Sequence, residues 1–353
     1  EAKVMKLKKT ITLATSLILS ASMIVGCSNK TNNKTEGGTT SSKVYKVGMV
    51  TDTGGVNDES FNQSTWKGLQ KLKKDYGDKV DVKYLESKQD AEYVPNIETF
   101  IDEDMDLIIG VGYKLKDAIA EASKNYPDNN FAIVDEVVDA KNVDSLIFED
   151  NVSSYLTGLI AGKMTKTGKV GFIGGIESEV LKKFEYGFKA GVLDSNPDVK
   201  ISTQYANSFS DAALGKSIAN QMHKNGIDVI FTAAGACGTG AIEAAKEGNK
   251  MAIGVDQDQN SLAPKNVITS AMKNIDIAVY NLSKKLIEGK YEGGQTIVNT
   301  LSTGGVGIAP TTKDNVPEDI LKYVDDAEEK IKSGDIKVPS NQEEFEKAYP
   351  NNK

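Results

Sequence analysis

The chain has 353 residues, a net charge of -8 at pH 7 and a single histidine. This length is enough for two domains of ordinary size, each able to bury a core. The net negative charge argues against a nucleic-acid partner, because nucleic-acid binding needs a basic surface. His223, at the end of a predicted helix beside Lys224, is expected to be solvated, and one histidine gives little material for a metal site. We predict no cofactor and no metal.

The N-terminal segment has the pattern of a secretory signal. Lys6, Lys8 and Lys9 precede an apolar run over 11–25, which is too short for a comfortable membrane span. The tetrapeptide at 24–27 (Ile-Val-Gly-Cys) matches a lipobox, in which the thiol of Cys27 receives diacylglycerol. We predict a lipoprotein signal peptide over 1–27 and an extracytoplasmic protein anchored to the cell membrane through Cys27. The alternative is an ordinary signal peptide with an incidental cysteine.

Residues 28–43 are rich in Asn, Thr, Ser, Gly and Lys and have no apolar periodicity, which predicts a flexible tether. A diacylglyceryl group carries two acyl chains, and each buried methylene contributes roughly 0.8 kcal/mol, so the anchor would be stable without a membrane helix. Cys237 is the one cysteine left after lipidation. An internal disulfide is therefore excluded, and Cys237 is interpreted as a small packed residue.

The rest of the chain contains an internal repeat at an offset of about 122 residues. Four blocks recur in the same order, and they are short apolar runs typical of strands buried on both faces of a parallel sheet. The matched blocks are 46–50 with 169–173, Phe61 and Gly68 with Phe184 and Gly191, 106–109 with 228–231, and 132–135 with 252–256. The last pair differs by one extra residue in the second copy.

Helical periodicity lies between and after these runs. Ser60 and Gln63 have the Ser-x-x-Gln form of a capping box, which predicts a helix start at Ser60. Further helices are expected over 94–101, from 212 to a stop near 225–226, over 241–246 with a stop at Gly248, from 275 to Gly289, and over 317–334.

Strands that alternate with helices predict an α/β protein with two doubly wound parallel-sheet lobes. We assign 44–150 plus approximately 274–305 to an N-terminal lobe, and 151–273 plus approximately 306–353 to a C-terminal lobe. Because the late elements follow both repeats, the chain is expected to cross between the lobes several times and to form a hinge.

Ligands of open parallel sheets bind beyond the carboxyl ends of the strands. Asp52 follows the first strand, Asp135 and Asp256 end equivalent strands in the two lobes, and Gly235 follows the strand over 228–233. Carboxylates accept hydrogen bonds from hydroxyl and ring N-H groups at roughly 1.5 to 3 kcal/mol each. An aspartate after a strand also caps helices and turns, but two at equivalent strand ends favour a shared ligand cleft.

Aromatic and basic candidates complete this predicted cleft. Phe61 stands at a helix start beside Asn62, and Phe209 follows a polar loop, with Phe184 as an alternative ring. Core packing is the competing interpretation for each phenylalanine. Lys273, just after the strand over 267–271, is placed to neutralise a cleft carboxylate or to be a solvated surface lysine.

With these residues the chain resembles the basic membrane lipoprotein family of ABC-transporter solute receptors, and within it the purine nucleoside receptors. The resemblance covers nearly the whole chain, and its most specific block is DTGGVNDESFNQ. The matching segments are the lipobox, 52–63 (DTGGVNDESFNQ), 132–135 (AIVD), 254–259 (GVDQDQ) and 270–273 (SAMK).

The family implies a type I periplasmic-binding-protein fold, no catalysis, and a nucleoside, here a purine nucleoside, held between the lobes. We further expect a monomer that delivers its ligand to ABC permease subunits. By this resemblance Phe61 and Phe209 would sandwich the base. Asp52, Asn62 and Asp135 would hydrogen-bond its edge or the sugar, and Gly235, Asp256 and Lys273 would hold the ribose. The motif alignment is less distinctive around Phe209 and Gly235.

Other chemistries have weaker support. Asp52 begins an Asp-Thr-Gly triplet like that of aspartic proteases, but the later triplet at 302–304 is Ser-Thr-Gly and lacks the second carboxylate. The segment from Asp256 begins like a calcium loop without its glycine or final glutamate, and 235–240 lacks the lysine of a P-loop. A receptor for a sugar or signalling molecule and a nucleoside-cleaving enzyme remain open. The N-terminal signal argues against a transcriptional repressor.

Overall fold

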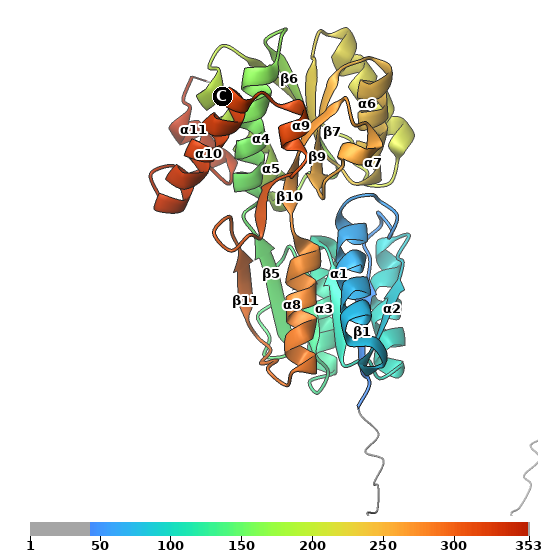
Figure 1. Cartoon of the computed structure of the whole chain (residues 1–353). Helices are drawn as coiled ribbons and strands as arrows, with labels where there is room; N and C mark the ends of the chain where they lie inside the picture. The colour runs from blue at the N-terminus through green and yellow to red at the C-terminus, as the bar shows by residue number, and fades with distance from the viewer. Residues whose placement is uncertain (1–42, 352–353) are drawn as a thin grey trace, which may run out of the picture. The chain divides into compact units, whose positions relative to one another are not determined.

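The computed structural model describes residues 43–351, which form two six-stranded sheets, each covered by helices on both faces (Figure 1). The predictions for the signal peptide, for Cys27 and for all but the last residue of the tether lie outside the described residues. Within the described part, no helix combines the length and hydrophobicity needed to cross a membrane.

The first sheet has the strand order β2-β1-β3-β4-β5-β11, and all of its pairings are parallel. Its inner strands are apolar and buried, as expected for strands covered on both faces. The strands are β1 (Tyr45–Val50), β2 (Val80–Leu85), β3 (Leu107–Val111), β4 (Phe131–Val134), β5 (Val143–Phe148) and β11 (Thr296–Asn299).

The second sheet repeats this plan with the order β7-β6-β8-β9-β10-β12. Five strands are parallel, whereas β12 runs antiparallel to β10 at the edge. The strands are β6 (Lys169–Gly174), β7 (Lys200–Tyr205), β8 (Val229–Ala233), β9 (Met251–Asp256), β10 (Val267–Lys273) and β12 (Val306–Ile308). The predicted class, two doubly wound α/β sheets, is confirmed.

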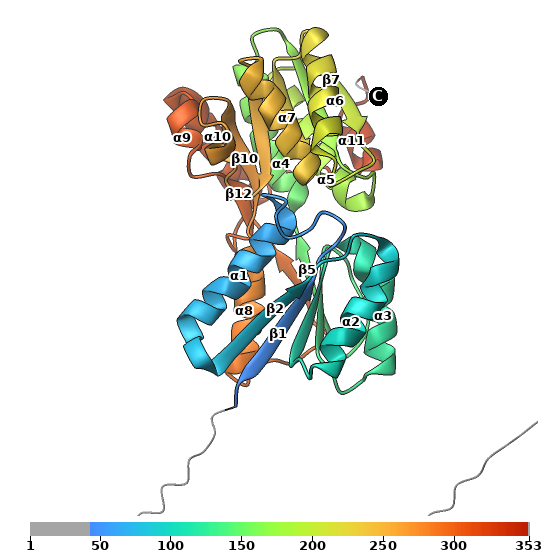
Figure 2. The ribbon, with the colours of Figure 1, turned by 90° about the vertical axis from the view of Figure 1, so that its right-hand side faces the viewer.

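Helices α1 (Phe61–Tyr76) and α8 (Ile275–Ile287) cover one face of the first sheet, and α2 (Tyr93–Asp102) and α3 (Lys116–Asn125) cover the other (Figure 2). On the second sheet α4 (Asp150–Met164) and α5 (Glu179–Ser195) pack together on one face, with α6 and α7 on the other. The remaining helices are α6 (Ala212–Lys224), α7 (Ala236–Glu247), α9 (Thr312–Asn315), α10 (Glu318–Ser333) and α11 (Gln342–Ala348).

The chain passes between the two sheets three times: from β5 to α4, from β10 to α8, and from β11 to β12. In each sheet the strand order reverses beside the first strand, between β1 and β3 and between β6 and β8. Such a switch point leaves a crevice at the carboxyl ends of the strands, where open α/β sheets bind ligands. The two crevices set the position of the candidate site.

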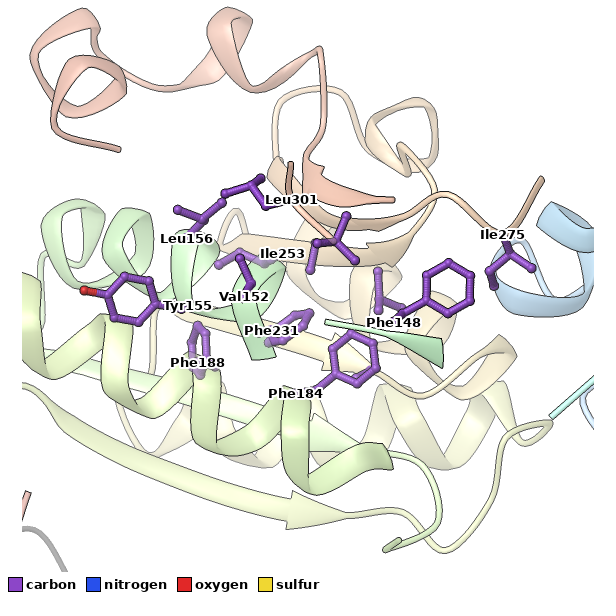
Figure 3. Packing of buried hydrophobic residues seen from close by; sticks show 14 of the residues in the cluster. Phe148, Val152, Tyr155, Leu156, Phe184, Phe188, Phe231, Ile253, Ile275 and Leu301 are labelled. Carbon is purple, nitrogen blue, oxygen red and sulfur yellow. The ribbon is translucent and has the colours of Figure 1, made fainter. Parts of the chain in front are cut away.

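Buried aromatic rings form the centre of the second sheet's core. Phe231 of β8 packs against Phe172, Phe184 and Phe188 at centroid distances between 5.2 and 6.3 Å. Figure 3 shows Phe148, the last residue of β5, beside Phe184, so the apolar core continues from the first sheet into the second. Burial of such rings contributes much of the hydrophobic stabilisation.

Helices α4 and α5 approach so closely that glycine is required at their contact. A Cβ atom on Gly191 would lie 2.0 Å from the carbonyl oxygen of Tyr155, and one on Gly158 would lie 2.3 Å from the carbonyl oxygen of Phe188. Backbone atoms have little freedom to move away from such a contact. The α4-α5 pair is therefore a rigid support for the second sheet.

We expect Gly191→Ala to lower the free energy of unfolding by about 2 kcal/mol, because the added methyl group forces the two helices apart. Urea denaturation followed by circular dichroism measures this loss. Gly307→Ala is the matched control, since a Cβ atom there meets no atom within 4 Å. Equal stability of the two variants would contradict the close-packing argument.

Candidate functional site

The carboxyl ends of the strands in both sheets line one cavity of about 530 Å³, a volume that includes its open mouth. All eight residues that the sequence nominated are brought together here. The lining consists of Asp52, Gly54, Asp58, Phe61, Asn62, Gly112, Tyr113, Asp135, Val180, Leu181, Phe184, Phe209, Ala233, Ala234, Gly235, Val255, Asp256 and Lys273.

Asp135 and Asp256 occupy equivalent positions at the ends of β4 and β9, and both adopt a left-handed backbone, with φ of 70° and 66°. This conformation is uncommon for residues other than glycine, although aspartate tolerates it. Its appearance at both repeats indicates that each strand end turns sharply to present its carboxylate. Backbone strain of this kind concentrates at functional sites.

Lys273, the last residue of β10, is fully buried between carboxylates of different elements. Its Nζ lies 2.5 Å from Asp135 Oδ1 of the first sheet and 3.1 Å from Asp150 Oδ1 at the start of α4. Burial by itself lowers the pKa of Lys273, but the carboxylates of Asp135, Asp150 and Asp256 outweigh it and raise that pKa. The cation therefore stays charged and joins the two lobes at the hinge.

A second contact joins the lobes in the opposite direction: the hydroxyl of Ser60, next to the first sheet, donates to Asp256 Oδ2 of the second sheet. The predicted capping box is therefore wrong: Ser60 does stand before α1, but its side chain does not cap the helix. Asp58 does so instead, since its carboxylate accepts from the backbone N-H groups of Ser60, Asn62 and Gln63. The hydroxyl is thus free to reach the other lobe.

A further set of hydrogen bonds joins the lobes outside the cavity, and we call it the latch. Gln257 Nε2 donates to Gln63 Oε1 at 2.8 Å, and Lys67 Nζ donates to Gln257 Oε1 at 2.5 Å. Gln259 Nε2 donates to the carbonyl oxygen of Glu59 at 2.7 Å. These bonds exist only when the start of α1 meets the segment after β9, so the structure is a closed form.

Asp52 and Asn62 form a polar pair at the end of β1. Asp52 Oδ1 accepts from the Gly54 N-H at 2.9 Å and from Asn62 Nδ2 at 2.8 Å, while the same amide nitrogen donates to Asp58 Oδ2 at 3.0 Å. Burial raises the pKa of Asp52 to about 6, against the lowering effect of the Asn62 and Gly54 hydrogen bonds. The carboxylate is therefore mainly ionised at neutral pH.

Glycines at strand ends make room for the two candidate rings. A Cβ atom on Gly112, after β3, would lie 3.4 Å from Phe61 Cε1, and one on Gly175, after β6, would lie 2.2 Å from Phe209 Cε1. Each ring therefore lies against bare backbone at a switch point. Phe184, the alternative ring, also lines the cavity but is 3% exposed and packs into the aromatic core.

Sequence reasoning missed three polar residues of the site: Asp58, Asp150 and Tyr113. Asp150 is buried and pairs with Lys273; burial raises the pKa of Asp150, while Lys273 opposes that shift. Tyr113 comes soon after β3, so the strand-end rule that identified Asp52 would also have found it. Asp58 carried a weaker signal, a carboxylate shortly before the first residue of a helix.

His223 is half-buried rather than solvated, which corrects the sequence expectation. Its Nδ1 lies 3.1 Å from the carbonyl oxygen of Ile227, and burial lowers its pKa. It lies at the end of α6 and is not among the residues that line the cavity. Within residues 43–351, no group of His, Cys, Asp and Glu side chains is placed to hold a metal ion.

Residues 45–342 match the model of the Bmp family, which is described as ABC transporter substrate-binding protein PnrA-like. The chain belongs to this family. The matched segment contains every strand and helix that lines the cavity, so the PnrA-like assignment covers the whole site and not one lobe alone.

Curated relatives extend over nearly the full chain. The CD4+ T-cell-stimulating antigen of Listeria monocytogenes is 45% identical, with 94% of this chain and 99% of that protein covered. The ABC transporter nucleoside-binding protein BmpA of Lactococcus lactis is 38% identical over the same shares. Basic membrane protein A of Borreliella burgdorferi is 38% identical, with 94% and 96% covered.

Solved structures of solute-binding proteins share the fold. An ABC transporter solute-binding protein from Aeropyrum pernix superposes with a TM-score of 0.77 at 26% identity, with 86% of this chain and 96% of that chain covered. One from Conexibacter woesei has a TM-score of 0.69 at 24% identity, with 84% and 99% covered. The PnrA-like chain thus has the architecture of ABC solute-binding proteins.

The buried carboxylate of Asp256 predicts a pH-dependent stability. Burial raises the pKa of Asp256 to about 7 from 3.8, against opposing effects of Lys273 and Ser60. Between these two values the folded chain holds a proton that the unfolded chain has released. The contribution of Asp256 to the free energy of unfolding therefore falls as the pH rises through this window.

We expect Asp256→Asn to raise the Tm of the closed PnrA-like protein by about 3 °C at pH 8, because a neutral amide avoids burying the charge. The gain should shrink steadily as the pH falls from 7 to 4. Differential scanning fluorimetry of both proteins at each pH measures the difference, and Asp198→Asn on the surface is the control. A gain in Tm that does not change with pH would contradict the raised pKa of Asp256.

Proposed function

We propose that this protein is an extracytoplasmic lipoprotein that binds a purine nucleoside in the cavity between its two sheets and delivers it to the permease of an ABC transporter. The observation that carries the proposal is the composition of the cavity. Two phenylalanine rings, Phe61 and Phe209, and a set of buried carboxylates line the same space. An aromatic base with a polyhydroxylated sugar has the matching chemistry.

The base would stack between Phe61 and Phe209. Aromatic pairs contribute about 0.5–1.5 kcal/mol beyond the area that they bury, and both rings lie against strand-end glycines that hold them in place. Stacking accepts any flat ring, so it favours nucleosides as a class. The edge of the base must then be read by polar groups, for which Asp52 and Asn62 are the candidates.

The ribose would lie at the opposite end, near Gly235, Asp256 and Lys273. Carboxylates accept hydrogen bonds from hydroxyl groups, and such charge-assisted bonds are stronger than neutral ones. The lining residues Asp52, Asp58, Asp135 and Asp256 face one cation, Lys273. This excess of negative charge favours a neutral nucleoside over a phosphorylated nucleotide.

Closure would connect binding with delivery. A ligand shifts the open-closed equilibrium only through contacts that differ between the two forms. The latch, the Asp135-Lys273 ion pair and the Ser60-Asp256 hydrogen bond are contacts of the closed form. The relative named nucleoside-binding BmpA supports the ligand class. We further propose that Cys27 carries the lipid anchor, that the protein acts as a monomer without nucleic acid, and that it catalyses no reaction.

We expect Phe61→Ala and Phe209→Ala each to weaken nucleoside binding at least tenfold, because each removes one stacking face. Isothermal titration calorimetry with guanosine, inosine and adenosine measures the loss on protein freed of ligand by unfolding and refolding. Tyr323→Ala, on the partly exposed ring of α10, is the aromatic control and should bind as the wild type does.

Mass spectrometry of the compound released from gently purified protein tests the ligand class directly. A purine nucleoside supports the proposal. A sugar or another small molecule, together with full binding by Phe61→Ala, would contradict it. A free base that accumulates when nucleoside is added would instead identify a nucleoside-cleaving enzyme.

The latch should contribute to affinity although it lies outside the cavity. We expect Gln257→Ala to weaken nucleoside binding about fivefold, because it removes two interlobe hydrogen bonds worth about 1 kcal/mol in total at this half-exposed position. Calorimetry gives the affinity. Small-angle scattering should show less compaction at subsaturating ligand than in the wild type.

Gln204→Ala, an exposed glutamine on the edge strand β7, is the matched control. Unchanged affinity in Gln257→Ala would show that the latch forms without energetic consequence. Absence of any ligand-dependent compaction in the wild type would count against closure as part of the mechanism.

A further inference from the structure

We infer that two free side-chain oxygens, Asn62 Oδ1 and Asp52 Oδ2, act as hydrogen-bond acceptors for the edge of the base. They select purines with adjacent ring N-H and amino donors, the 2-amino-6-oxopurines, over 6-aminopurines. This inference rests on the proposed function and adds a preference among nucleosides to it. It depends on how Asp58 and Asp52 fix the amide of Asn62.

The orientation of the Asn62 amide follows from its neighbours. Its Nδ2 lies 2.8 Å from Asp52 Oδ1 and 3.0 Å from Asp58 Oδ2. The flipped amide would place its oxygen against two carboxylate oxygens, which repel it. Both amide hydrogens are therefore used, and Asn62 has only its oxygen left for a ligand.

That remaining oxygen is buried and has no hydrogen-bond partner among the described residues. Asn62 is 1% exposed and lines the cavity. A buried polar atom without a partner carries a free-energy cost, which a ligand donor would remove. Asn62 Oδ1 is thus free to accept a hydrogen bond from a ligand.

Asp52 provides the second acceptor. Its Oδ1 is occupied by Gly54 and Asn62, whereas no described residue donates to its Oδ2. A Cβ atom on Gly112 would lie 3.5 Å from that Oδ2 and 3.4 Å from Phe61 Cε1. The free oxygen therefore lies near the edge of the ring on which the base would stack.

Asp58 acts as a positioning residue in this arrangement. Its carboxylate caps α1 through three backbone N-H groups and holds the Asn62 amide at the same time. Asp58 thus sets the orientation of the Asn62 amide. The same side chain caps the helix and fixes which atom of the Asn62 amide faces the ligand.

Two adjacent acceptors match the N1-H and the 2-amino group of guanine. Hypoxanthine keeps the N1-H and lacks the amino group. Adenine presents a bare N1 lone pair beside its amino group, and that lone pair meets an acceptor. Sites that leave such polar atoms unpaired discriminate strongly between close analogues.

The test is calorimetry on the full chain, freed of ligand, with guanosine, inosine and adenosine. We expect guanosine to bind at least tenfold more tightly than adenosine, with inosine between them. Similar affinities, or tighter binding of adenosine, would overturn the inference and leave the proposed function intact. Failure of every nucleoside to bind would overturn the proposed function itself.

Asp52→Asn gives a second, sharper readout. The oxygen of the new amide must remain where Gly54 and Asn62 donate, so the amide nitrogen takes the place of the free Oδ2 and turns an acceptor into a donor. We expect the ratio of guanosine to adenosine affinity to fall at least tenfold, while the isosteric side chain keeps the fold. An unchanged ratio would overturn the inference. Asp198→Asn, on the surface, is the matched control and should keep the wild-type ratio.

Discussion

In the closed structure, two buried carboxylates each pair with a side chain of the opposite lobe, and the other interlobe contacts depend on these pairs. Asp135 ends a strand of the first sheet and pairs with Lys273 of the second, while Asp256 ends the equivalent strand of the second sheet and accepts from Ser60 of the first. A buried charge without a partner is costly. Each lobe thus needs the other to satisfy the acid at its own strand end.

This dependence makes the site sensitive to small changes. Asp135, Lys273 and Asp150 form one buried group in which a single cation serves two carboxylates, and Phe61, Phe148 and Phe184 surround the ammonium at 5.0 to 5.5 Å from their ring centroids. Low local polarity strengthens every interaction in such a group. A ligand that enters would compete for groups already engaged across the hinge.

The scaffold keeps these groups in register through close backbone packing. Gly158 and Gly191 let α4 and α5 touch along the second sheet, and Gly68 lets α1 approach α8, where a Cβ atom would lie 2.4 Å from the carbonyl oxygen of Asp276. Rigid lobes matter because hinge motion then moves the start of α1 as a unit. The first-lobe partners of the latch, Ser60 and the Asp58-Asn62 pair all belong to that unit.

The sequence by itself determined a good part of this result. Buried strands are continuous apolar runs, so β1, β3, β4, β6, β8 and β9 could be recognised from hydrophobicity, and their repetition gave the two-sheet plan. The rule that ligands lie beyond strand ends then identified Asp52, Asp135, Gly235 and Asp256. Edge strands β2 and β7 consist mostly of exposed and partly buried residues and carried no comparable signal, because an edge strand has a neighbour on one side only and is covered less completely.

Only the tertiary structure decided which groups pair with which. Nothing local in the sequence indicates that Ser60 serves Asp256 instead of its own helix, that Asp58 takes over the cap, or that Asp150 shares Lys273 with Asp135. Most of these contacts join residues from separate elements, and some join separate sheets. Local propensity therefore identified the elements, whereas the hydrogen-bond partners were fixed by the folding of two repeats against each other, since a buried polar group must find a partner wherever the fold provides one.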